Sequence, residues 1–158
     1  MAAPVASARS AQTGIKLVDG YRSQITIALN PAINFWEKSN KPPGVDGGEP
    51  IPQTTMSNNL WRTMAARSLQ TLTTSTSKAA YDPVLYTEIL AVLNKPTTIT
   101  QSFGDGSTLA YYGYIQKMEF AELVEGTQPE CDVTIVPTNF DPVNHVEAGP
   151  TLTSVAGT

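Results

Sequence analysis

Residues 99–120 read ITQSFGDGSTLAYYGYIQKMEF, and this stretch predicts a β-hairpin. Gly104 to Ser107 carries the Gly and Asp residues that tight turns between strands favour. The second strand runs from about Thr108 to Phe120 and carries large apolar groups on both predicted faces. Tyr112, Tyr114 and Met118 share one face, while Tyr111 and Ile115 share the other. Such a strand is expected to be covered on both sides, either within the chain or by another subunit.

The flanking segments predict further strands. Alternation from Gln24 to Leu29 is typical of a half-buried strand, and Cys131 to Val136 predicts a last strand that ends at Pro137. The Thr-rich stretch from Leu60 to Tyr81 predicts one long strand or two short ones.

One helix is predicted, with Asp82 as its N-cap, Pro83 in the first turn and Asn94 at its end. Together these elements predict a mainly β (α+β) fold, an antiparallel β-sandwich or partly open barrel with one flanking α-helix.

Less patterned segments surround this predicted domain, which spans residues 23–142. Residues 1–22 are expected to form an N-terminal arm that needs a partner to become ordered, and residues 143–158 a C-terminal tail with little order of its own. Within the domain, residues 37–59 contain four prolines and three glycines, which exclude a helix or a central strand. We therefore expect a long functional loop there.

Composition argues against several classes of function. The chain has a formal net charge of −4 and no basic stripe, so tight binding to nucleic acid is not expected. One His and one Cys leave almost no material for a catalytic triad or a thiolate metal site, so we expect no enzyme, no cofactor and no metal. The sequence shows neither a secretory signal nor an apolar run of membrane-spanning length, which predicts a soluble protein made in the cytoplasm with no membrane anchor.

An ordered set of motifs resembles one known family, the major tail tube proteins of long-tailed, siphovirus-type bacteriophages. The motifs are Ala28–Pro31, Phe35–Glu37, Lys41–Gly48, Thr54–Met56, Trp61–Ala65, Tyr81–Pro83, Asp105–Leu109, Gly113–Tyr114 and Ile135–Asn139. The likeness covers residues 23–142, although Gly104 replaces an expected Pro and Ser57–Asn59 departs from the pattern at the end of the loop.

The resemblance implies a structural virion protein of the phage tail. Six copies are expected to close a hexameric ring, and stacked rings to form a tube through which phage DNA passes to the host without specific binding. The implied partners are other copies of the chain, a tape measure protein, and tail terminator and initiator proteins. The protein would be made in the cytoplasm of the bacterial host.

Two sets of site residues follow from these expectations. The predicted subunit contacts are Trp36, Val45, Ile51, Met56 and Trp61, which lie in or beside the long loop. The predicted channel wall is polar and net acidic, with Thr71, Thr73, Glu119, Glu122 and Asp132 as lining residues. We expect the loop to be mobile in a monomer and ordered in the tube.

Other interpretations remain open at this point. The aromatic residues Trp36, Trp61, Tyr111, Tyr112 and Tyr114 are equally consistent with one ordinary core, or with the recognition surface of a monomeric β-sandwich that binds a sugar or peptide. An enzyme acting through the acidic segment from Glu119 to Asp132 would need a carboxyl with a strongly raised pKa. A tail terminator or connector would stop at a single ring.

Overall fold

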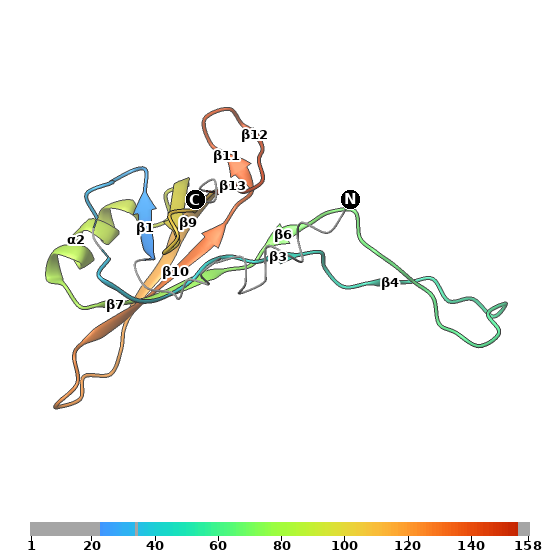
Figure 1. Cartoon of the computed structure of the whole chain (residues 1–158), viewed down its shortest axis with the longest axis horizontal. Helices are drawn as coiled ribbons and strands as arrows, with labels where there is room; N and C mark the ends of the chain where they lie inside the picture. The colour runs from blue at the N-terminus through green and yellow to red at the C-terminus, as the bar shows by residue number, and fades with distance from the viewer. Residues whose placement is uncertain (1–22, 34, 155–158) are drawn as a thin grey trace, which may run out of the picture.

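The structure is a computed structural model, and it describes residues 23–33 and 35–154. Its elements in chain order are β1 (Gln24–Ile27), β2 (Glu37–Lys41), β3 (Val45–Asp46), β4 (Ile51–Pro52), β5 (Met64–Ala65), β6 (Thr71–Leu72), β7 (Ser75–Ala80), α2 (Pro83–Val92), β8 (Thr97–Ser102), β9 (Thr108–Phe120), β10 (Glu130–Pro137), β11 (Phe140–Asp141), β12 (Val146–Glu147) and β13 (Thr151–Thr153). They form a body, with a long two-stranded extension that leaves it on the side away from α2 (Figure 1).

The body is built on one curled antiparallel sheet. Over the described residues its strand order is β1-β8-β9-β10-β7-β2, with β13 also paired to β9. The two outer strands of this order are linked, because the backbone N–H of Ile25 in β1 donates to the Glu37 carboxylate of β2 at 2.8 Å. The predicted mainly β fold, a partly open barrel with one flanking helix, is confirmed.

The predicted hairpin is formed by β8 and β9, in register from Thr97 opposite Gly113 to Ser102 opposite Thr108. Its turn is stabilised by the Asp105 carboxylate, which accepts from the Ser107 backbone N–H at 2.9 Å and from the Ser107 hydroxyl at 2.6 Å. Gly106 has a φ of 90°, a conformation that glycine adopts without strain. Local chemistry is therefore sufficient to position this hairpin.

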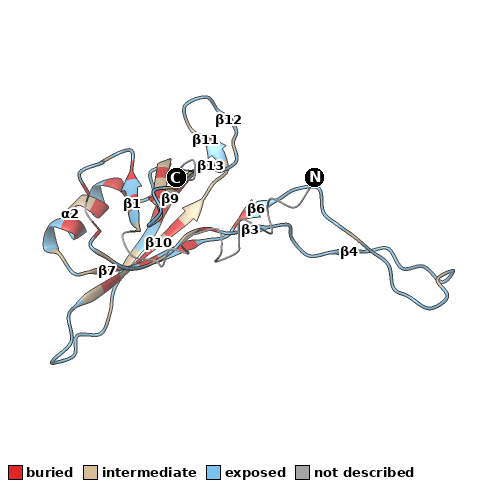
Figure 2. Cartoon of the chain, in the orientation of Figure 1, coloured by how far each residue is buried: buried red, intermediate tan, exposed pale blue. Residues whose placement is uncertain are grey.

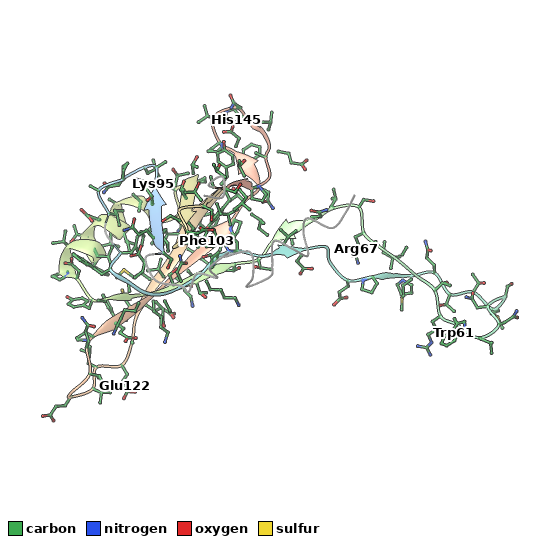
Figure 3. The ribbon with its side chains drawn as sticks, viewed as in Figure 1. Trp61, Arg67, Lys95, Phe103, Glu122 and His145 are labelled. Atoms are coloured by element: carbon green, nitrogen blue, oxygen red, sulfur yellow. The ribbon has the colours of Figure 1, made fainter. Side chains whose placement is uncertain are left out.

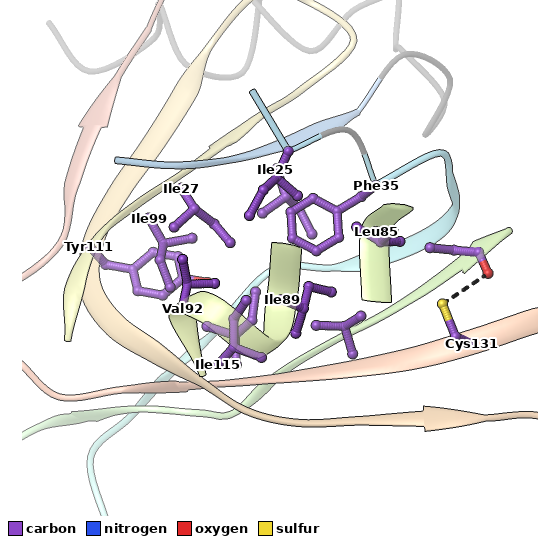
Figure 4. Packing of buried hydrophobic residues seen from close by; sticks show 14 of the residues in the cluster. Ile25, Ile27, Phe35, Leu85, Ile89, Val92, Ile99, Tyr111, Ile115 and Cys131 are labelled. Atoms are coloured by element: carbon purple, nitrogen blue, oxygen red, sulfur yellow. Dashed lines mark hydrogen bonds between the residues drawn. The ribbon is translucent and has the colours of Figure 1, made fainter. Parts of the chain in front are cut away.

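The helix also lies where the sequence predicts it. Asp82 caps it by accepting a hydrogen bond from the Val84 backbone N–H at 2.9 Å, and Pro83 occupies the first turn. Leu85, Ile89 and Val92 are buried on the side that faces the sheet (Figure 4). This face and one face of the sheet make the core, whose buried apolar members are Ile25, Ile27, Ile33, Phe35, Leu72, Ala79, Leu85, Ile89, Val92, Ile99, Tyr111, Ile115, Cys131, Val133 and Ile135.

A β-bulge in β9 overturns the predicted assignment of its two faces. Ile115 lies opposite Ile135, whereas Lys117 lies opposite the preceding residue of β10, so Gln116 is an extra residue in β9. Met118, opposite the buried Val133, therefore lies on the same face as Ile115 rather than on that of Tyr114. The predicted faces of Met118 and Phe120 were therefore wrong, because the extra residue reverses the alternation beyond it. Before the bulge, Tyr112 and Tyr114 do lie on the face opposite Tyr111 and Ile115, as predicted.

Predictions for three other segments also need correction. Residues 37–59 include strands β2, β3 and β4 rather than one irregular loop, and residues 60–81 contain three strand segments rather than one or two. The stretch after Pro142 is more ordered than expected, since β13 pairs with β9 from Thr151 opposite Ala110 to Thr153 opposite Thr108. The predicted N-terminal arm, residues 1–22, lies outside the described residues.

A buried polar network ties β7, β8 and β9 together. The Gln101 side-chain amide donates to the Ser75 hydroxyl and to the Tyr111 hydroxyl, both at 2.9 Å, and Ser75 donates to the Lys41 carbonyl at 2.8 Å. Burial raises the pKa of Tyr111 to about 12, although its hydrogen bonds with Ser75 and Gln101 act in the opposite direction.

This pKa predicts a specific loss of stability in alkali. An unfolded Tyr loses its proton near pH 10, while folded Tyr111 keeps it to about pH 12. The stabilisation that protonated Tyr111 contributes is therefore fully present below pH 10. As the pH rises from 10 to 12, the free energy of unfolding falls by about 2–3 kcal/mol. Denaturant unfolding between pH 9 and 12 should show this fall in the parent and in Tyr114→Phe but a shallower one in Tyr111→Phe. An identical pH dependence in all three proteins would contradict the assignment.

Candidate functional site

The two-stranded extension is the most unusual feature of the molecule. We call residues 42–74 the hairpin arm; its strands pair from Val45 opposite Leu72 at the base to Pro52 opposite Met64 farther out. At the base the Gly44 backbone N–H donates to the Thr73 hydroxyl, and the Thr73 backbone N–H donates to the Gly44 carbonyl, both at 2.8 Å. The four prolines expected to make an irregular loop instead lie in an extended hairpin, where a strand without a central position in a sheet tolerates them.

The hairpin arm exposes large apolar side chains that its own chain does not cover. Between residues 47 and 70 no residue is buried (Figure 2). The exposed large apolar residues of the hairpin arm are Val45, Ile51, Met56, Leu60, Trp61, Met64 and Leu69, and Trp61 at the tip is 80% exposed. Exposed apolar surface of this extent is typical of a surface that contacts another molecule.

Four of the five predicted subunit-contact residues, Val45, Ile51, Met56 and Trp61, lie on the hairpin arm. Trp36 lies elsewhere, in the body just before β2, with a φ of 47°. Its indole N–H donates to the Asp82 carboxylate at 3.2 Å, so this side chain helps to join the start of β2 to the start of α2. The sequence placed Trp36 beside the loop correctly but did not indicate that it contacts the helix cap.

The sheet face opposite the core is polar, and we call it the polar face. Thr76, Lys78, Lys117, Glu119, Asp132 and Thr134 lie on it, because they are out of phase with the buried residues of β7, β9 and β10, and Ser39 and Lys41 of β2 lie on it because they pair with Lys78 and Thr76. These residues line a shallow hollow, and Thr26 and Thr100 continue the face onto β1 and β8. Hydroxyl groups and charges therefore dominate this part of the sheet, while Tyr112, Tyr114 and Val136 lie on the same side farther along β9 and β10.

Charges on the polar face lie mostly beside charges of opposite sign. Lys117 forms an ion pair with Glu119 at 3.2 Å, and Lys78 lies directly opposite Asp132 in the sheet register. Three lysines, counting Lys41, stand against two carboxylates, so this face does not carry the acidic excess that the sequence suggested for a channel wall. At its edge Lys38 donates to Glu130 at 2.6 Å, which lowers the pKa of that carboxyl.

The predicted channel-lining residues are divided by the structure. Glu119 and Asp132 are opposite each other in the register of β9 and β10 and share the polar face. Thr71 belongs to β6 and Thr73 follows it at the base of the hairpin arm, while Glu122 lies in the connection between β9 and β10. The sequence also suggested the row from Thr71 to Thr76 for the channel wall, and of this row Thr76 lies on the polar face. Sequence reasoning missed Thr134, which the alternation of the Glu130–Pro137 strand could have indicated.

Evidence for catalytic chemistry is weak in the described part of the chain. It contains no group of three or more His, Cys, Asp and Glu side chains that could hold a metal ion. Cys131 is fully buried, and burial raises the pKa of its thiol. The enzyme alternative requires a raised pKa in the acidic segment, but the Lys38 hydrogen bond shifts the pKa of Glu130 downward.

Among residues 23–33 and 35–154, no helix is long and apolar enough to span a membrane.

Comparison with known proteins gives matches in structure only. No family model and no curated protein sequence matches the chain. A chain in the virion of a native gene transfer agent particle superposes with a TM-score of 0.61 at 9% identity, covering 87% of this chain and 100% of its own length. A chain of the anti-feeding prophage baseplate gives 0.57 at 8% identity, with 78% and 93% covered. A chain in the tail of an empty gene transfer agent particle, refined with helical C6 symmetry, gives 0.56 at 10% identity, with 89% and 100% covered.

Proposed function

We propose that this chain is a structural subunit of a phage-type tail, in which copies close into hexameric rings that stack into a tube for DNA delivery. The observation that carries the proposal is a shared fold over 89% of the chain with a protein from a helical tail of C6 symmetry. The exposed apolar side chains of the hairpin arm support it, because they need a second molecule to cover them. A closed ring would also pair sheet edges that a monomer leaves open.

The polar face is the surface best suited to line such a tube. Its hydroxyl groups hydrate well, and its charges are largely balanced by neighbours, so it offers DNA no cluster of cations that would hold phosphates. The proposed channel wall is therefore polar with roughly balanced charges, and not net acidic as the sequence suggested.

In the proposed tube a tape measure protein occupies the lumen during assembly, and terminator and initiator proteins contact the two ends. The subunits are made in the host cytoplasm and reside in the virion.

The first test is microscopy of the purified protein at high concentration, combined with measurement of its mass in solution. The proposal predicts tubes with sixfold rings. The match to a baseplate chain favours a second candidate, a subunit of a terminal ring, which predicts single rings that do not lengthen. A protein that stays monomeric at high concentration and beside a tail initiator would contradict both.

Labelling can test which face lines the lumen. Thr76 is exposed on the polar face, and the only native cysteine, Cys131, is fully buried. A gold label on Thr76→Cys should therefore appear on the tube axis in cross-sections by electron microscopy, whereas a label on Val143→Cys in the β11–β12 connection should appear off the axis. Gold density from Thr76→Cys on the outer surface of the tube would show that another face lines the channel.

A further inference from the structure

A second exposed apolar surface lies on the body, beside α2. Tyr81, Tyr86 and Phe120 form an aromatic cluster, with the Phe120 ring centroid 5.5 Å from each tyrosine ring. The three side chains remain 42–50% exposed. Leu90, one turn of α2 after Tyr86, is exposed as well, and we call these four residues the aromatic patch. Leu123 and Val124, in the connection that follows β9, are also exposed. Clustered aromatic rings of this kind commonly anchor protein interfaces.

Charge around the aromatic patch is mostly negative, although Lys38 and Lys117 pair with two of the carboxylates there, Glu130 and Glu119. The two segments that build it, residues 81–94 and 119–130, contain Asp82, Glu88, Glu119, Glu122, Glu125 and Glu130 and no Lys or Arg. The outer part of the hairpin arm has the opposite character: residues 51–65, from the Ile51–Ala65 pair to the tip, contain Arg62 and no Asp or Glu, whereas Asp46 and Glu49 lie nearer the base. Arg62 is exposed next to Trp61, so a positive charge lies beside the main apolar group at the tip.

We infer that the aromatic patch receives the tip of the hairpin arm from a second copy of this chain. Both surfaces are apolar, and their charges are complementary, which favours this pairing over contacts between two arms or two patches. Figure 3 places Trp61 at the far end of the hairpin arm and Glu122 at the opposite end of the molecule, so a chain does not reach its own patch. Different complementary surfaces at opposite ends make a heterologous contact, which continues from copy to copy.

This inference rests on the proposed function and names the contact within it. A photo-cross-linking amino acid in place of Trp61 tests it directly in assembled tubes. Mass spectrometry should locate the cross-links in residues 81–90 and 120–125 of another copy. Cross-links confined to residues 1–22, to another hairpin arm or to the polar face would overturn the inference while leaving a tube-forming function intact. If the parental chain forms neither tubes nor rings, the function and the inference fail together.

Charge reversal gives an independent test with a rescue. One variant changes the arm tip, Arg62→Glu, and a second changes the patch side, Glu122→Arg with Glu125→Arg. Each variant should slow tube formation at least about tenfold, because like charges then face each other. Combining all three substitutions should restore assembly. Glu147→Arg, an exposed carboxylate of β12 outside both surfaces, is the control and should assemble normally. Normal assembly of the two single-surface variants, or no rescue by their combination, would overturn the inference.

Discussion

Shortening the hairpin arm to a tight turn is expected to abolish tube formation while the body stays folded. Asp46 and Thr71 lie directly opposite each other, so an Asn-Gly dipeptide can join them after removal of residues 47–70. No residue in the removed stretch is buried, so the core loses no packing and the melting temperature should stay within about 4 °C of the parent. Calorimetry measures stability, and electron microscopy and sedimentation measure assembly.

A less drastic variant separates the role of the side chains from that of the backbone. The triple variant Met56→Ser, Leu60→Ser, Trp61→Ser removes three apolar side chains that are each at least 80% exposed. It retains every strand of the arm. This variant should also form no tubes, whereas Gln53→Ala with Asn59→Ala should assemble like the parent. Tubes of normal length from the shortened protein would show that the hairpin arm is dispensable and would contradict its proposed role.

Gly113→Val is expected to be the most damaging single substitution in the body. A Cβ at this position would lie 2.7 Å from the Val136 carbonyl oxygen and 3.3 Å from the Pro137 Cα, so the clash is with the backbone of β10 and not with a side chain that can move. Overpacking typically costs about 1–3 kcal/mol, and a clash with backbone atoms that cannot move aside belongs at the upper end, about 3 kcal/mol. For a chain of this size, that cost lowers the melting temperature by roughly 10 °C.

The matched control is Gly47→Val in the hairpin arm, where no atom lies within 4 Å of the added Cβ. Thermal unfolding should place this control close to the parent and Gly113→Val far below it, with most of the latter insoluble at 37 °C. Equal melting temperatures for the two variants would mean that β9 and β10 can separate at Gly113 without cost.

The two groups of predicted site residues differ in how closely the structure places their members together. The subunit-contact candidates came from large apolar groups among prolines and glycines, and the structure brings Val45, Ile51, Met56 and Trp61 onto one exposed arm. For the channel wall, only Glu119 and Asp132 share a sheet face. The aromatic patch was not predicted, because Phe120 at the end of β9 meets Tyr81 and Tyr86, beside and within α2, only in the folded body.

Elements that the sequence by itself determined are those whose signals lie within a few residues. The β8–β9 turn depends on Asp105 and Gly106, and α2 depends on its Asp82 cap and on Leu85 and Ile89 one turn apart. Only the tertiary structure decided the bulge at Gln116, the pairing of β13 with β9, and the long separation of the arm tip from the aromatic patch. These features depend on which distant strand lies alongside, because hydrogen bonding across a sheet joins residues far apart in the chain. Local propensity contains no information about that choice of neighbour.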